Sequence, residues 1–315
     1  MQFSTPIPIA ESARKIGYGS QVVSLGSCFA VNMADKFDYF QFRHTVNPFG
    51  ILFHPMAIEK LIGFAEMHKT FSDSDVFFHN ERWHCFDAHS DLSHPDKETL
   101  LQKLNQAIGE THRQIQSATH LIITYGTAWV YREKTSGAVV ANCHKVPQAN
   151  FTKELLSVET IRESMIKTIQ SIRRLNPEAQ IIFTVSPVRH LKDGFVGNQR
   201  SKSHLIAALH GVLETQSGAD YFPSYEIVMD ELRDYRFYAE DLIHPNTMAV
   251  DYIWERFATT QLSSEAHPIM EQVGSLRRSL VHRPFNPNSE SHQLFLNKLQ
   301  QSISALQKQF PHMRF

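Results

Sequence analysis

An aspartate and a histidine three positions apart are the first candidate for chemistry in this sequence. Asp241 and His244 stand in the segment Asp-Leu-Ile-His-Pro. At this spacing both side chains can point to one place, so the carboxylate can fix one tautomer of the imidazole while the other ring nitrogen faces a nucleophile. The pair therefore predicts a general base oriented by an acid. The competing interpretation is a capped turn before a helix that begins at Pro245.

The partner nucleophile is expected near the N-terminus, in the segment Gly-Ser-Cys-Phe-Ala at residues 26–30. Residues 22–25 are typical of a buried strand and residues 29–37 of a helix, so this segment lies on a strand-to-helix turn. We favour Cys28 as the nucleophile, because a helix N-terminus and a nearby imidazole lower the pKa of a thiol. Ser27 is the alternative nucleophile or a helix N-cap. A buried structural role also stays open for Cys28.

Strands alternate with helices along most of the chain, which predicts a parallel sheet covered on both faces. Strands are expected at residues 22–25, 121–125, 181–185 and 221–228, with a hairpin formed by 129–131 and 139–140. Amphipathic helices are expected at residues 29–42, 55–68, 99–117, 157–175, 202–215 and 246–257. After residue 261 the sequence becomes polar and proline-interrupted before a last helix at 292–309. We therefore divide the chain into a domain at 1–262 and a helical appendage at 263–315.

Composition excludes several classes of protein. The chain has 31 basic and 32 acidic residues without a basic cluster, which argues against a nucleic-acid or anionic-membrane surface. No segment resembles a secretory signal or a membrane span. The three cysteines are odd in number and widely spaced, so no disulfide framework is expected. We expect a cytoplasmic protein, and no nucleotide-binding fingerprint suggests a cofactor.

Several segments together resemble one known family. The signature GSCFA stands at residues 26–30, and the other matching segments are Asn47-Pro48-Phe49-Gly50, Tyr125-Gly126-Thr127, Ala141-Asn142-Cys143-His144-Lys145, Ser186-Pro187-Val188-Arg189-His190 and the Asp-Leu-Ile-His-Pro segment. The chain thus resembles the GSCFA family of the SGNH/GDSL hydrolase superfamily over about residues 20–260. This resemblance implies a three-layer α/β/α sandwich around a mostly parallel sheet. It also implies an esterase that forms a covalent acyl-enzyme on small acyl esters of carbohydrate-like alcohols.

The resemblance also implies roles for single residues, with two departures. The superfamily's nucleophile is the serine of Gly-Asp-Ser, and here Cys28 stands at that place. Its oxyanion donors are the nucleophile's own amide, a glycine amide and an asparagine in Gly-x-Asn, where this chain has alanine instead of asparagine. The candidate donors and ligands in this region are Gly50, Gly126, Thr127 and Asn142.

Two further groups can serve the substrate. Arg189 follows an expected strand, at the edge where parallel sheets bind ligands, and it can hold a carboxylate or phosphate. A loop rich in histidine and aspartate covers residues 84–94, and we expect it to be a solvated loop rather than a metal site. The alternative is a lid that brings Trp83, Phe86 and His89 to the substrate cleft. The alternatives to a hydrolase are an O-acyltransferase and a non-catalytic carbohydrate-binding module. The appendage is expected to cap the cleft or to form a homo-oligomer interface.

Overall fold

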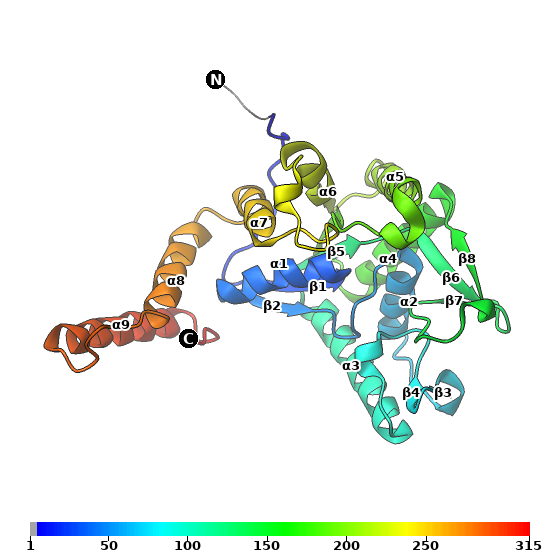
Figure 1. Cartoon of the computed structure of the whole chain (residues 1–315), viewed down its shortest axis with the longest axis horizontal. Coiled ribbons are helices and arrows are strands. Elements are labelled where there is room, and N and C mark those ends of the chain that lie inside the picture. Colours follow the sequence, from blue (N-terminus) through cyan, green and yellow to red (C-terminus); the bar gives the residue numbers. More distant parts are fainter. Residues whose placement is uncertain (1–4) are drawn as a thin grey trace.

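A parallel sheet forms the centre of the molecule, for which the computed structural model describes residues 5–315 (Figure 1). Within these residues it has five strands, in the spatial order β10 (Ala219–Phe222), β9 (Gln180–Val185), β5 (His120–Tyr125), β1 (Gln21–Gly26) and β2 (Arg43–Val46). All neighbouring pairs are parallel. The three inner strands are almost entirely buried, as expected for a parallel sheet with helices on both faces.

Helices cover both faces of this sheet. One face carries α2 (Pro55–Glu66), α3 (Lys97–Ser117), α4 (Val158–Leu175) and α5 (Gly194–Leu213), and the other carries α1 (Cys28–Tyr39) and α7 (Thr247–Gln261). Successive side chains of a strand point to opposite faces. The sheet therefore has two hydrophobic cores: the first lies between it and α2, α3, α4 and α5, and the second lies between it and α1 and α7. In β5, Leu121 and Ile123 belong to the first core, while Ile122 belongs to the second. The expected three-layer α/β/α architecture is confirmed.

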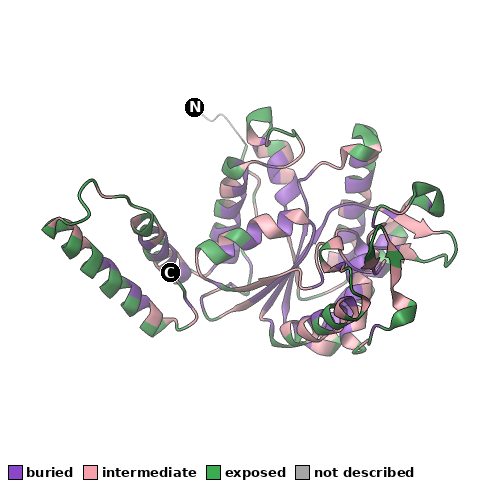
Figure 2. Cartoon of the chain, turned by 60° about the horizontal axis from the view of Figure 1, so that its bottom comes forward, coloured by how far each residue is buried: buried purple, intermediate pink, exposed green. Residues whose placement is uncertain are grey.

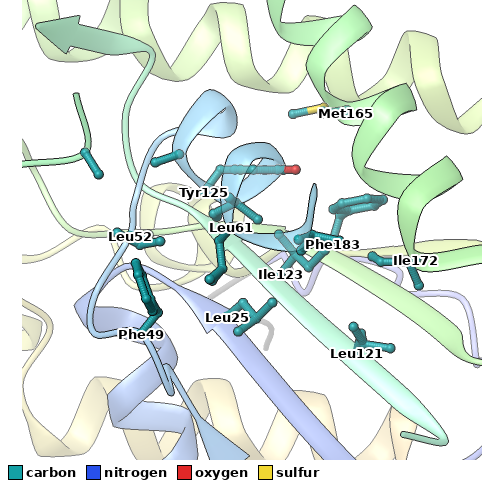
Figure 3. Close-up of a cluster of buried hydrophobic side chains, with 14 of the residues drawn as sticks. Leu25, Phe49, Leu52, Leu61, Leu121, Ile123, Tyr125, Met165, Ile172 and Phe183 are labelled. Atoms are coloured by element: carbon teal, nitrogen blue, oxygen red, sulfur yellow. The ribbon is translucent and has the colours of Figure 1, made fainter. Parts of the chain in front are cut away.

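The first core contains the largest group of buried side chains (Figure 3). Leu25, Ile123 and Phe183 come from three adjacent strands and pack against side chains of α2 and α4, such as Leu61 and Met165. Each of these side chains is at most 3% exposed. The loops that follow the carboxyl ends of these strands are therefore anchored on a close-packed core.

Two small antiparallel sheets are added to the layers. One contains β6 (Trp129–Glu133), β7 (Val139–Val140) and β8 (Phe151–Leu155), and the other contains β3 (Phe77–His79) and β4 (Arg82–His84). The β6–β7 hairpin is the one that the sequence predicts. The sequence does not predict β2, β3, β4 and β8, whose short segments alternate too little to stand out from loops.

The expected strand at residues 221–228 is only half correct. Its second part forms the short helix α6 (Ser224–Glu226) and a π-helical turn at Ile227–Glu231. Tyr225, Ile227 and Val228 are buried there against the sheet and its neighbours. Tertiary packing thus overrides the strand preference of these aromatic and β-branched side chains.

The C-terminal region is a helical hairpin at one end of the molecule (Figures 1 and 2). It consists of α8 (Ala266–Leu280) and α9 (Glu290–Gln309), and α9 is largely exposed. Helix α8 is missing from the sequence prediction because of Pro268, which lies in its first turn, where proline is tolerated. The division of the chain at residue 262 stays a prediction. Among residues 5–315, none of the helices has the length and apolar character needed to cross a bilayer.

Candidate active site

The turn after β1 holds the predicted nucleophile close against the neighbouring strand. Gly26 has φ of 138°, and a Cβ atom there would lie 2.2 Å from the carbonyl oxygen of Thr124. The Gly26 amide donates to the Asn47 side chain at 2.8 Å, and the Ser27 amide donates to the Thr124 carbonyl at 3.1 Å. Only glycine fits this conformation and this contact. The turn therefore places Cys28 at the first position of α1.

Ser27 and Cys28 have different surroundings. Ser27 is 2% exposed, and its hydroxyl finds no hydrogen-bond partner within residues 5–315. It stands at the N-cap position, yet its side chain does not cap the helix. Both residues line the same pocket, but Cys28 is only half-buried. An attacking atom must reach its substrate, so the geometry favours Cys28 over Ser27.

The expected low pKa of the Cys28 thiol is not found. Burial raises this pKa above its usual value. The amide of Cys28, the Lys202 ammonium and the Phe29 amide all act in the opposite direction but do not outweigh burial. The helix N-terminus thus acts as expected, but the resting group is a thiol. A thiol must lose its proton during attack, so this nucleophile needs a general base.

Asp241 and His244 form the expected pair. The His244 Nδ1 group donates to Asp241 Oδ2 at 2.6 Å. Asp241 Oδ1 accepts from the amides of Ile243 and His244 at 2.9 and 3.0 Å. The His244 amide, then its ring, then the Ile243 amide lower the pKa of Asp241 to about 2. With Nδ1 holding the hydrogen, the Nε2 atom is left to accept a proton.

This pair is exposed and locally strained. The side chains of His244 and Asp241 are 44% and 46% exposed. Leu242 between them has φ of 56°, which is rare for a leucine. Such strain costs on the order of 1–3 kcal/mol and persists only where the surroundings enforce it. Here the two hydrogen bonds from backbone amides to the Asp241 carboxylate fix the turn.

Both halves of the site meet at one pocket of about 530 Å³. Ser27, Cys28 and His244 line it, beyond the carboxyl ends of β1, β5 and β9. This is the edge at which parallel α/β sheets usually bind ligands. The Arg189 amide donates to the Ile243 carbonyl at 3.2 Å, which ties the histidine segment to the loop after β9. Folding thus brings together two segments more than 200 positions apart.

Four of the other predicted site residues line or approach this pocket. Arg189, Thr127 and Asn142 line it, whereas Gly126 lies at its base and donates its amide to the Phe53 carbonyl at 2.7 Å. The Thr127 hydroxyl bonds with Ser201 at 2.8 Å. Since the Gly126 amide already donates to the Phe53 carbonyl, it is not available as an oxyanion donor. The Arg189 guanidinium lies over the ring of Tyr238, 4.1 Å from its centroid.

Gly50 and His89 lie together, away from the lining of this pocket. The Gly50 amide donates to the Asn47 carbonyl at 2.8 Å, and a Cβ atom on Gly50 would lie 2.3 Å from that of His89. Gly50 therefore serves a turn and a close approach, not an oxyanion hole.

The alternative of a lid is not supported, because Trp83, Phe86 and His89 do not line this pocket and its aromatic lining comes from Phe53, Trp129 and Tyr131. Residues 5–315 contain no cluster of three or more His, Cys, Asp or Glu side chains suited to holding a metal ion.

Sequence reasoning missed Lys202, which is completely buried beneath the pocket. Its ammonium donates to the carbonyls of Gly126 and Ser186, both at 2.6 Å. A signal was present, because Lys202 is in helical register with the buried Leu205, Leu209 and Val212. A lysine on the apolar face of a helix is unusual enough to mark a special position.

The fold and the pocket define an α/β protein with a thiol, an imidazole and a carboxylate gathered at the carboxyl edge of a parallel sheet. The chain matches the model of the GSCFA family over residues 21–257 and that of the GSCFA domain protein, C-terminal domain, over residues 273–315. It therefore belongs to the GSCFA family, as the sequence segments predict. No match was found among curated proteins.

One solved structure is a distant likeness. It is the acetyl xylan esterase Est2A from the rumen bacterium Butyrivibrio proteoclasticus, with 10% sequence identity and a TM-score of 0.39. The match covers 84% of this chain and 65% of the esterase, so the chain spans less than two thirds of that protein. A likeness of this degree assigns neither an activity nor a substrate.

Proposed function

We propose that this protein is an ester hydrolase with Cys28 as the nucleophile and His244 as the general base. The observation that carries the proposal is the shared pocket: a half-buried thiol at a helix N-terminus and an imidazole held by a carboxylate line the same cavity. This set of groups matches the requirements of nucleophilic catalysis at a carbonyl. The GSCFA resemblance to SGNH hydrolases supports the same reaction.

Acylation begins with the protonated thiol. His244 Nε2 removes the proton from Cys28 as the sulfur forms a bond to the ester carbonyl carbon, and the carbonyl electron pair moves onto its oxygen. We assign the amides of Cys28 and Phe29, in the first turn of α1, as the donors for that oxyanion, since both act on the Cys28 sulfur. The intermediate then breaks its bond to the alcohol oxygen, which takes the proton from His244.

Deacylation uses the same groups in reverse. Water attacks the thioester while His244 accepts its proton, and collapse of the intermediate releases the acid and the Cys28 sulfur, which is protonated again. Asp241 keeps its charge and stabilises the imidazolium that forms twice in the cycle. The aromatic rings of Phe53, Trp129 and Tyr131 suit the apolar faces of a sugar alcohol, so we propose small acyl esters of carbohydrates as substrates.

The test compares ester turnover in two single variants of the intact chain. With p-nitrophenyl acetate and acetylated sugars, Cys28→Ala is expected to lose at least about 1,000-fold in kcat/KM, as is usual when a covalent nucleophile is removed. Ser27→Ala is expected to keep most of the activity, because Ser27 is only 2% exposed.

The control is Cys143→Ala, which removes another thiol that lines the same pocket. Equal activity in Cys28→Ala and the wild type would overturn the proposal, as would a loss confined to Ser27→Ala. A wild-type chain that binds acetylated sugars without turnover would support the carbohydrate-binding alternative.

A further inference from the structure

Lys202 occupies an unusual position for a charged residue. Its side chain is 0% exposed, and it enters from α5 to the point where β5 and β9 end. There its two hydrogen bonds join the carbonyl of Gly126, just after β5, to that of Ser186, just after β9. The ammonium group thereby links the two loops that form the floor of the pocket.

No carboxylate neutralises this buried cation in the described part of the chain. Lys202 forms no ion pair with any aspartate or glutamate of residues 5–315. Buried charges are ordinarily paired, because removal from water is costly. Desolvation accordingly lowers the pKa of Lys202 to about 7, and the effect that opposes it is the charge of Cys28.

The titratable groups that face Lys202 come from three other elements. Cys28 belongs to α1, His190 to the loop after β9, and Tyr225 to α6, with its ring centroid 5.7 Å from the ammonium. His190 stays neutral, because burial, then Lys202, then His244 lower its pKa to about 3. Burial raises the pKa of Tyr225. Cys28 is thus the facing group that becomes an anion during the proposed reaction.

We propose that Lys202 is a positioning residue that offsets the negative charge formed on the Cys28 sulfur while holding the two pocket loops together. This inference rests on the proposed function for its role in catalysis. The electrostatic coupling itself can be measured without an ester. Lys202 is not among the residues that line the pocket, so it acts through Cys28 and not on the substrate.

Two variants separate the charge from the bridging role. Lys202→Gln keeps amide hydrogens for the loop carbonyls but removes the charge, whereas Lys202→Arg keeps the charge. The rate of Cys28 alkylation by iodoacetamide follows its thiolate fraction, measured from pH 6 to pH 10 by peptide mass spectrometry. In Lys202→Gln the rate at pH 6, where a lysine with a pKa of about 7 is mostly charged, is expected to fall about tenfold, which is one pKa unit. Lys202→Arg is expected to stay closer to the wild type.

The matched control is Lys167→Gln, which removes an exposed lysine from α4 and is expected to leave the rate unchanged. Alkylation of Cys28 at the wild-type rate in a folded Lys202→Gln chain would overturn the inference. An equal slowing in both Lys202 variants would also overturn it, since shape and not charge would then be responsible. Because no ester is involved, a failed esterase assay leaves this test intact.

Discussion

The two halves of the candidate site are built in different ways. Cys28 follows a buried strand and begins a helix, so both cores hold its backbone in place. Asp241 and His244 lie on an exposed segment that is held mostly by hydrogen bonds within four residues, with one further tie from the Arg189 amide to the Ile243 carbonyl. Packing therefore determines the position of the nucleophile, whereas local bonds determine that of the base. We expect changes in the first region to affect folding and changes in the second to affect catalysis.

The largest effect is expected from Gly26→Ala in the buried half. The added Cβ atom would lie 2.2 Å from a backbone oxygen, at a φ of 138°. Strain and overpacking together are expected to cost about 3 kcal/mol or more of the free energy of unfolding. Chemical denaturation measures this loss. As a control, Gly109→Ala in α3, where no atom lies within 4 Å, is expected to stabilise by about 0.5–1 kcal/mol. A Gly26→Ala chain as stable as the wild type would contradict this account of the turn.

The second prediction concerns the exposed half. Asp241→Asn removes the charge that orients and supports the His244 ring, so kcat is expected to fall by at least about 100-fold. Stability at neutral pH is expected to change little compared with Gly26→Ala, because the pair is nearly half exposed. Ester turnover and denaturation in the same preparation measure both effects. Unchanged kcat would show that Asp241 only caps a turn.

The third prediction is the acid response of the same pair. The folded pKa of Asp241 is about 2, below its ordinary value of about 4. A lowered carboxyl pKa contributes stability above the ordinary value, and this contribution is lost as the pH falls toward 2. The free energy of unfolding is therefore expected to decline less steeply between pH 4 and pH 2 in Asp241→Asn. Parallel declines in the two chains would contradict the bonds assigned to this carboxylate.

The smallest effect is expected from Cys143→Ser, which compares two thiols in one pocket. Burial raises the pKa of Cys143 to about 11, and within residues 5–315 no charge or helix amide opposes this effect. A thiol with so high a pKa is inert near neutral pH. Activity is therefore expected to stay within about twofold of the wild type. A large loss would mean that the nucleophile had been assigned to the wrong cysteine.

The sequence predicts the elements of the site better than its details. The runs that become β1, β5 and β9 are mostly apolar, and the spacing of Asp241 and His244 is local, so both could be recognised. The occupied amides of Gly50 and Gly126 could not be foreseen, because their acceptors are set by loop conformation. The raised pKa of the Cys28 thiol could not be foreseen either, because the burial of its sulfur depends on the whole fold.

The central claim is that the Cys28 sulfur carries the acyl group. Acid quenching in the first turnovers with p-nitrophenyl acetate, followed by peptide mass spectrometry, tests it most directly. The account predicts one acetyl group on the peptide that contains Cys28, located on its sulfur and removed by hydroxylamine. An acetyl group on Ser27, or continued turnover without any acetylated peptide, would contradict it.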